Sequence, residues 1–278
     1  MSAQSFIVLH DIATGAEEVV YETPDLIEAP NWSPCGTFLV LNGGGRVFRF
    51  DLADGAITWI DTSPLRALNN DHGISPDGTR LVVSESPGRG TSCIYTLPIT
   101  GGAPIRVTDE VPSYWHGWSP DGATLAYTAM RDGVFQIFTI PAAGGTERQL
   151  TFGPGHRDGP DYTPDGAWIW FNSDHHGTTP DLWRIRPDGS DLEQMTDDSQ
   201  VNWFPHPSPD GQHVLYLAYG PHVLDHPRGE EVALKLMPQS GGPARTIATL
   251  FGGQGSINVP NWAPDARRFA YVRYARPA

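Results

Sequence analysis

Short runs of large apolar residues recur at regular intervals along the chain, and each run is bounded by turn-forming residues. The clearest runs lie at 38–40, 81–83, 125–127, 169–171, 214–216 and 269–271. Apolar stretches of this length between turn signals are typical of buried β-strands. The pattern therefore predicts an all-β protein.

A Ser-Pro-Asp-Gly-like tetrapeptide precedes each of these six runs. The copies begin at Ser33, Ser75, Ser119, Thr163, Ser208 and Ala263. Successive prolines in them are 42, 44, 44, 45 and 55 residues apart, a period expected of propeller blades. Proline presets φ for a type I turn, and the closing Gly is expected to take the left-handed conformation, which other residues resist.

A second series of glycine-containing turns lies between the first. These turns are at 14–15, 54–55, 101–102, 144–145, 188–189 and 241–242. Each is flanked by two alternating apolar stretches, which is the pattern of a hairpin. Four strands in each of six repeats predict a six-bladed β-propeller of four-stranded blades.

The two ends of the chain indicate how the ring closes. Only twelve residues follow Ala266, whereas two further strand-like stretches lie at 5–10 and 17–21. We therefore expect the N-terminal strands to form the outer part of the last blade, which removes an open sheet edge. The whole chain, residues 1–278, is then a single domain.

Charge and motifs exclude several classes of function. A formal net charge of −14 argues against a nucleic-acid partner, because that affinity comes mainly from Lys and Arg. The N-terminus has no basic region, and its apolar run at 6–9 is too short for a signal peptide or a membrane span. We expect a cytoplasmic protein with no membrane partner. No Gly-x-Ser-x-Gly, Walker or Rossmann pattern occurs, so no nucleotide cofactor is expected.

The histidines fall mainly on one face of the expected ring. In a propeller the innermost strands line the central channel, and the second-to-third loops share a face with the blade-to-blade loops. Eight of the ten histidines are expected there, namely His72, His116, His156, His175, His176, His206, His222 and His226. The same face carries the least repetitive loops and an insertion at 220–231. Irregular loops on a rigid scaffold are where functional groups are usually found.

Three of these histidines could hold a metal ion. His72, His116 and His206 come from separate blades and could meet around a divalent metal such as Mn, Zn, Fe, Ni or Ca. The alternative is that each histidine caps its strand by bonding to a nearby carboxylate or carbonyl. The predicted catalytic residues, which would exchange protons near neutral pH or carry substrate charge, are His116, His156, Arg157 and Asp158.

Aromatic rings beside amides and carboxylates form surfaces that bind sugars. The predicted substrate-binding residues of this kind are Asn70, Asp71, Tyr114, Trp115, Asn202, Trp203, His226, Arg228, Gln254 and Asn258. Trp115 and Trp203 break the repeat register and could belong either to the pocket or to the core between blades. Trp32, Trp118, Tyr162 and Trp262 recur directly before the turn and are expected in the inter-blade core.

The repeats resemble a known family. Trp-Ser-Pro-Asp-Gly-like turns before apolar strands, with strand ends such as Arg106-Val107-Thr108 and Arg148-Gln149-Leu150-Thr151, resemble the TolB-type six-bladed propeller over essentially the whole chain. The segment at 206–210 is also similar to oligogalacturonate lyases, a resemblance that implies a manganese-binding histidine at His206.

Two kinds of function are therefore expected. The first is a carbohydrate-active enzyme, a metal-assisted lyase or hydrolase that acts on a sugar or a uronic-acid-containing oligosaccharide. The alternative is a non-catalytic protein that binds a sugar, or a TolB-like scaffold that binds a protein partner on the long-loop face. Turnover separates an enzyme from a sugar-binding protein, and the sequence carries no signal for turnover.

Overall fold

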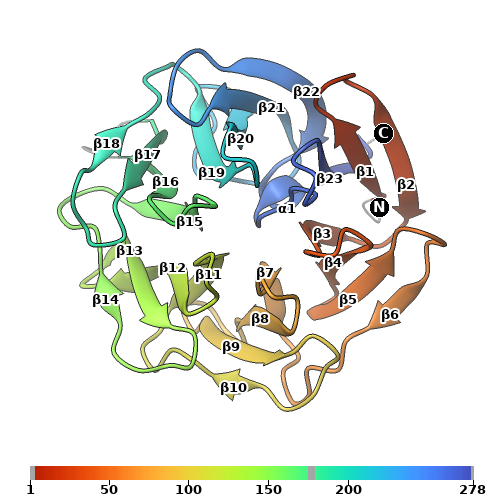
Figure 1. Cartoon of the computed structure of the whole chain (residues 1–278), viewed down its shortest axis with the longest axis horizontal. Coiled ribbons are helices and arrows are strands. Elements are labelled where there is room, and N and C mark those ends of the chain that lie inside the picture. The colour runs from red at the N-terminus through yellow and green to blue at the C-terminus, as the bar shows by residue number, and fades with distance from the viewer. Residues whose placement is uncertain (1–3, 175–178, 277–278) are drawn as a thin grey trace.

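Six antiparallel sheets form a ring around a central axis in the computed structural model, which describes residues 4–174 and 179–276 (Figure 1). The first blade contains β3 (Ile27–Trp32), β4 (Phe38–Gly43), β5 (Arg46–Asp51) and β6 (Ile57–Trp59). The second contains β7 (Leu68–Ile74), β8 (Arg80–Glu85), β9 (Cys93–Pro98) and β10 (Ile105–Arg106). The third contains β11 (Ser113–Trp118), β12 (Thr124–Arg131), β13 (Val134–Pro141) and β14 (Arg148–Gln149).

The next two blades have the same order from the axis to the rim. The fourth blade contains β15 (Arg157–Tyr162), β16 (Ile169–Ser173), β17 (Asp181–Ile185) and β18 (Glu193–Gln194). The fifth contains β19 (Val201–Pro207), β20 (His213–Tyr219), β21 (Glu230–Pro238) and β22 (Arg245–Gly252). The predicted six-bladed, all-β architecture is confirmed. His175 and His176 lie outside the described residues.

The ring closes as predicted, between the two ends of the chain. β23 (Arg268–Tyr274) pairs with β1 (Ser5–Asp11), and β1 pairs with the outermost strand β2 (Glu17–Thr23). The innermost position of this blade differs from the other five. There Trp262 forms only an isolated bridge with Phe269, and the short helix α1 (Gln254–Ile257) precedes it. Pro260 lies just before this bridge, and a proline has no N–H to donate to a ladder.

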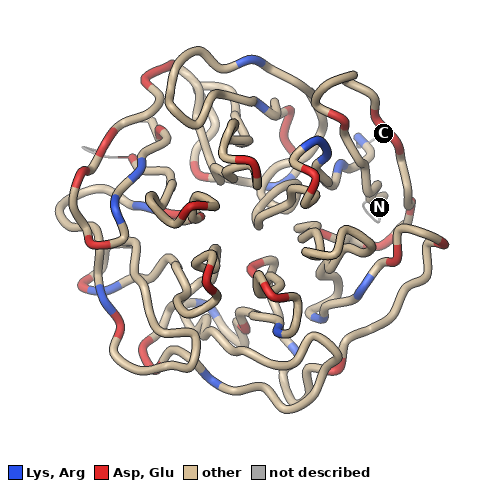
Figure 2. The backbone as a smooth tube through the Cα atoms, in the orientation of Figure 1, with Lys and Arg blue, Asp and Glu red and all other residues tan. Residues whose placement is uncertain are grey.

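The tetrapeptide turns are built from their own side chains. In the second blade, Ser75 Oγ donates to Asp77 Oδ1 at 2.6 Å, and the same oxygen accepts the amide of Thr79 at 3.0 Å. The closing glycines of five turns have φ between 68° and 77°, which confirms the predicted left-handed conformation, and Ala266 in the sixth turn also adopts it, with φ 56°. Figure 2 shows acidic residues at these turns near the centre of the ring. Their carboxylates are therefore used to hold the turns.

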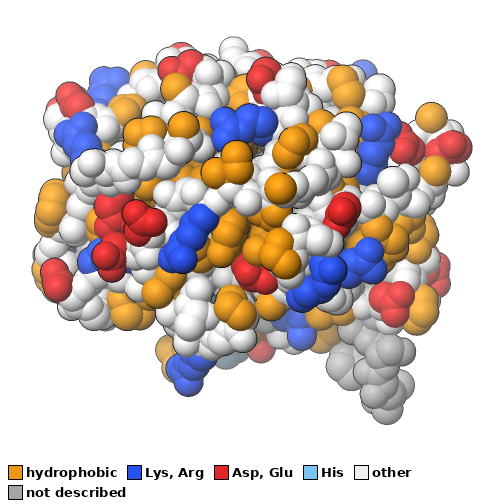
Figure 3. Space-filling view, turned by 90° about the horizontal axis from the view of Figure 1, so that it is seen from below, with side chains coloured by type: hydrophobic (Ala, Val, Ile, Leu, Met, Phe, Trp, Pro, Cys, Tyr) orange, Lys and Arg blue, Asp and Glu red, His pale blue; other side chains and the backbone are white. Residues whose placement is uncertain are grey.

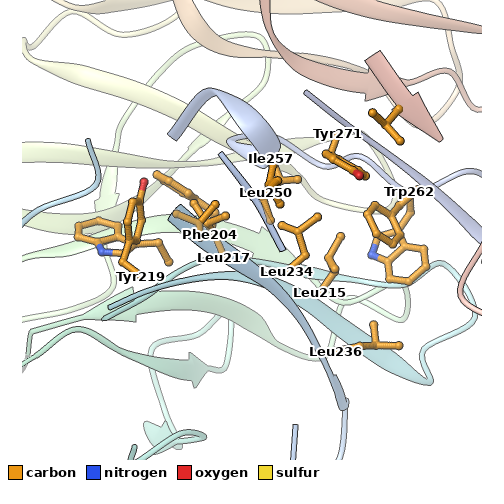
Figure 4. Packing of buried hydrophobic residues seen from close by; sticks show 14 of the residues in the cluster. Phe204, Leu215, Leu217, Tyr219, Leu234, Leu236, Leu250, Ile257, Trp262 and Tyr271 are labelled. Atoms are coloured by element: carbon orange, nitrogen blue, oxygen red, sulfur yellow. The ribbon is translucent and has the colours of Figure 1, made fainter. Parts of the chain in front are cut away.

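Buried aromatic and aliphatic side chains fill the space between blades. One cluster joins the fifth and sixth blades, and Figure 4 shows Leu215 and Leu234 between Phe204 and Trp262. The predicted inter-blade positions of Trp32, Trp118, Tyr162 and Trp262 are confirmed, because each is buried in such a cluster. Seen from the side, the rim carries hydrophobic, basic and acidic side chains in a mixed pattern (Figure 3). The described part of the chain contains no helix long and apolar enough to cross a membrane.

Candidate functional site

β-Bulges near the axis set the direction of the side chains that face the channel. The pairing of β15 with β16 shifts between Asp158 and Asp161, and that of β19 with β20 shifts between Trp203 and His206. Gly159 at the first bulge has φ 65°, and a Cβ there would lie 3.0 Å from the ring of Phe204. A bulge re-aims the side chains beside it, and these two bulges place Asp158 and Trp203 in the wall of a cavity.

This cavity has a volume of about 1000 Å³. It is bounded by the second to fifth blades and by the loop at 220–229, which lies between β20 and β21. It brings together ten of the predicted site residues, namely Asn70, Asp71, Tyr114, His116, His156, Arg157, Asp158, Trp203, His226 and Gln254. Residues far apart in the sequence therefore share one concave site, the usual form of a small-molecule site.

Two predicted substrate-binding residues lie away from the cavity, in the packing between and within blades. Trp115 is 1% exposed and packs closely against Gly73, where a Cβ would lie 2.0 Å from the indole ring. It therefore belongs to the inter-blade core. Asn202 is fully buried, and its Nδ2 donates to Asp198 Oδ1 at 3.1 Å. Both side chains therefore lie away from the cavity wall, and for Trp115 the structure matches the core alternative.

The predicted metal ligands are not brought together as a set. His206 uses both ring nitrogens, with Nδ1 at 3.0 Å from Asp161 Oδ2 and Nε2 at 2.6 Å from the carbonyl oxygen of Ile257. His72 Nε2 donates to the carbonyl of Val40 at 3.1 Å. Burial lowers the pKa of His72 to about 4, so its ring is neutral at pH 7.

No group of three or more His, Cys, Asp or Glu side chains in the described ranges is placed to hold a metal ion. The three histidines therefore do not fit a metal site. Their contacts match the alternative in which a histidine ties its strand to a neighbouring group.

A buried carboxyl group stands on one side of the cavity. Asp71 is 3% exposed, and its Oδ1 accepts a hydrogen bond from Asn258 Nδ2 at 2.7 Å. Asn258 itself does not line the cavity but positions this carboxyl group. Within the described residues no ion pair involves Asp71. Burial raises the pKa of Asp71 to about 6, which suits a proton donor.

The pKa of a second carboxyl group in the cavity, that of Asp158, is shifted in the opposite direction. His116 Nε2 lies 3.1 Å from Asp158 Oδ1. Burial acts to raise the pKa of Asp158, but the hydrogen bond and positive charge of His116 outweigh it and hold the pKa at about 2. Burial likewise acts to lower the pKa of His116, and the bond to Asp158 reverses the direction and raises it. Asp158 is therefore a carboxylate at neutral pH, in the same cavity as Asp71 with its raised pKa.

The other two predicted catalytic residues have fixed hydrogen bonds. The amide of Phe135 donates to His156 Nδ1 at 3.1 Å, so the proton of the neutral ring is on Nε2 and that atom is a donor. Arg157 is 1% exposed, and its Nη1 donates to Gly155 O at 2.9 Å and to Gln136 Oε1 at 3.0 Å. Arg157 therefore holds the loop before β15, and His156 is placed to donate rather than to act as a base.

The loop at 220–229 covers the fifth-blade side of the cavity. His226 Nε2 lies 3.7 Å from Asp158 Oδ2 and 3.2 Å from Asp225 Oδ1. Its ring meets the ring of Trp203 edge-on, with centroids 4.3 Å apart. Arg228, predicted to bind substrate, instead pairs with Glu28 at 3.2 Å and does not line the cavity.

Some cavity residues were missed by sequence reasoning. Thr128 of β12, Phe135 of β13 and Asp174 after β16 all line the cavity. The prediction considered only the innermost strands and the long loops. The ends of the second and third strands reach the same face and carry these residues. That connectivity is the signal that could have indicated them.

The repeated turns and the closed ring define the protein as a β-propeller of the PD40-repeat class. The family model for the TolB β-propeller domain, PD40, matches residues 114–221. The chain is 49% identical over 274 residues to an uncharacterized protein of Agrobacterium fabrum, covering 98% of this chain and 93% of that protein. A solved TolB-like structure from Agrobacterium tumefaciens superposes with a TM-score of 0.96 at 49% identity, covering 100% of both chains. The chain belongs to the family of TolB-like six-bladed propellers.

More distant relatives share the fold. The Tol-Pal system protein TolB of Francisella tularensis is 24% identical over 254 residues, covering 88% of this chain and 56% of that protein. The chain thus spans about half the length of that curated relative. An oligogalacturonate lyase in complex with manganese superposes with a TM-score of 0.59 at 16% identity, covering 88% of this chain and 72% of the lyase. At that identity the likeness concerns the fold alone.

Proposed function

We propose that the protein is a carbohydrate-active enzyme that hydrolyses a glycosidic bond in the cavity by acid–base catalysis. The observation that carries this proposal is the presence of two carboxyl groups with opposite pKa shifts in one site. The pKa of Asp71 is raised to about 6, whereas that of Asp158 is held at about 2. Such a pair supplies the acid and the base that glycoside hydrolysis needs.

Each carboxyl group has a definite task in this proposal. Asp71 donates its proton to the glycosidic oxygen as the bond to the leaving sugar breaks. Asp158 takes a proton from the water that attacks the anomeric carbon. His116 stabilises the negative charge of Asp158 before that transfer, through the 3.1 Å contact between them. Exchange with solvent then returns the proton from Asp158 and restores the acid form of Asp71, so no net proton is consumed.

Three aromatic residues and one fixed donor would hold the sugar. The cavity wall contains Tyr114, Phe135 and Trp203. The ring centroids of Tyr114 and Phe135 are 6.1 Å apart. Apolar sugar faces stack on such rings. His156 presents its Nε2–H as a donor to a sugar hydroxyl, because its Nδ1 already accepts the amide of Phe135.

The test is release of reducing ends from a panel of oligosaccharides by the purified protein. In Asp71→Asn the proton donor is lost, but the bond from Asn258 can be kept. We expect kcat to fall by about 10²- to 10³-fold with little change in the Kd for the intact sugar. A matched control is Asp191→Asn, which removes an exposed carboxylate between β17 and β18. The absence of product from every sugar in the panel would remove the enzymatic proposal.

A protein partner on the same face is the second candidate. Leu224 in the insertion is 87% exposed, and Phe152 in the loop after β14 is 68% exposed. Exposed large apolar side chains near a functional cavity are typical of interaction surfaces. A photo-crosslinking residue at Leu224 should give one discrete protein adduct in cells if this candidate is correct, and only diffuse labelling if it is not.

A further inference from the structure

We infer that the cavity takes a sugar that carries a basic nitrogen, such as a glucosamine oligosaccharide, and rejects uronic acids. This inference rests on the proposed function of the same site and specifies its class of substrate. It follows from the charges on the cavity wall, from what already neutralises them and from where they lie around the ring.

Acidic groups outnumber available basic groups in the cavity. Among the described residues its wall contains four acidic side chains, the proposed proton donor Asp71 and the carboxylates of Asp158, Asp174 and Asp225. Its only Lys or Arg side chain in those ranges is Arg157, whose guanidinium donates to main-chain oxygens of the loop before β15 and to Gln136 Oε1 of β13, and which also interacts electrostatically with Asp174. An anionic ligand would therefore meet several like charges, each of which costs affinity in a partly desolvated site.

The histidines do not reverse this balance. His116 faces Asp158, with which it forms an ion pair. His226 lies between Asp158 and Asp225, so its ring nitrogen is also directed at carboxylates. His156 offers one N–H and accepts a main-chain amide on its other nitrogen. A cationic ligand keeps all of these contacts and adds its own attraction to the remaining negative charge.

The acidic groups are divided between two sides of the ring. Asp71 comes from β7, whereas Asp174 follows β16 and Asp225 lies in the loop after β20. Figure 1 shows β7 across the channel from β19. An ammonium group can thus bind on the side of Asp174 and Asp225, where Trp203 also lines the cavity, while Asp71 on the far side keeps its proton. Aromatic rings add a cation–π contribution to such a site.

The experiment compares binding of trisaccharides that differ in charge. Isothermal titration calorimetry would use four trisaccharides. They are the glucosamine trisaccharide with free amines, here called chitotriose, its fully N-acetylated form, cellotriose and trigalacturonate. We expect chitotriose to bind at least about tenfold tighter than cellotriose at low salt, a preference that shrinks in about 1 M salt. Asp174→Asn and Asp225→Asn should each reduce this preference several-fold, and Asp191→Asn, with its exposed carboxylate between β17 and β18, should not.

Binding and turnover together distinguish the possible failures. Tighter binding of chitotriose without hydrolysis supports the charge preference and removes the enzymatic proposal. Hydrolysis of cellotriose with equal affinity for all four sugars supports the enzyme and overturns the charge preference. Preferential binding of trigalacturonate, or no binding of any of the four, overturns it as well.

Discussion

The neighbouring residues Asp71 and His72 should make opposite contributions to the pH dependence of stability. Burial raises the pKa of Asp71 from 3.8 to about 6 and lowers that of His72 from 6.5 to about 4. The stabilising contribution of Asp71 is complete below pH 3.8 and is lost as the pH rises through about 6. That of His72 is complete above pH 6.5 and is lost as the pH falls through about 4.

The two contributions have similar size. Each shift is roughly two pKa units or slightly more, and one unit corresponds to about 1.4 kcal/mol, so each group changes the free energy of unfolding by about 3 kcal/mol. Both side chains are at least 97% buried, since Asp71 is 3% exposed and His72 0% exposed, so solvent screening is small. Their opposite signs make the two changes cancel between about pH 4 and 6.5.

Single substitutions should expose each contribution separately. In Asp71→Asn the His72 contribution is no longer balanced. As the pH rises from about 4 to 6.5, the free energy of unfolding of this variant should therefore increase by about 3 kcal/mol relative to that of the parent. In His72→Gln it should fall by about the same amount over that range. Urea unfolding at a series of pH values measures both, with constant m-values as evidence that each transition remains comparable.

The double variant is the control for this reasoning. Asp71→Asn with His72→Gln removes both contributions, so its pH dependence should run parallel to that of the parent. If the Asp71→Asn curve is itself parallel to the parent curve, the carboxyl group titrates normally in the folded protein. That result would also remove Asp71 as a proton donor.

Three further results follow from the contacts described above. His206→Ala leaves the buried carboxyl group of Asp161 without its partner, so the free energy of unfolding measured in urea should fall by about 3–5 kcal/mol. An unchanged stability with lost activity would instead mark His206 as a functional group. Gly73→Ala places a Cβ 2.0 Å from the ring of Trp115. Calorimetry should therefore show a fall in Tm of at least about 5 °C, or incomplete folding. A Tm within about one degree of that of the parent would mean that the Trp115 ring moves freely. The kcat for hydrolysis should decrease as the pH rises through about 6, where Asp71 ionises, and a rate that stays constant to pH 8 would contradict its role as the acid.

Much of the fold could be predicted because its determinants are local. Turn residues require particular φ values wherever they occur, and their period gives the number of blades without knowledge of any contact. The innermost strand of the last blade could not be predicted in this way. The segment at 254–257 has no strong helix signal, and its helical turn depends on packing against β3 and β23.

The location of the site was also predictable, but the direction of its side chains was not. Connectivity alone places the long loops and the innermost strands on one face, and Asp71, His116 and Asp158 do meet there. Arg157 lines the same wall with its guanidinium turned to loop carbonyls. Such directions depend on bulges and on hydrogen bonds to other blades, which a single repeat does not reveal.

His206, predicted as a metal ligand together with His72 and His116, differs from them by one residue in its position on the strand. Counted back from the serine of each turn, His72 and His116 stand three positions before it, whereas His206 stands two positions before it. Because side chains alternate along a strand, a shift of one residue directs them to opposite sides. His206 therefore shares its position with Asn31 and Asp161, and like them it bonds to a neighbouring blade.

Two blades lack this bond, and each supplies one group of the proposed chemistry, whereas the proposed base Asp158 comes from the fourth blade, which keeps the bond through Asp161. In the second and third blades the position two before the turn is Gly73 or Gly117. There the neighbouring blade approaches so closely that a Cβ would lie 2.0 Å from the Trp115 ring or 2.8 Å from a main-chain oxygen. Close packing replaces the side-chain bond there, and the cavity residues lie just upstream, with Asp71 two residues before Gly73 and His116 directly before Gly117. In this ring the position two before the turn holds neighbouring blades together, and the cavity residues are carried by the positions before it, from Asp71 and His116 to Asp158.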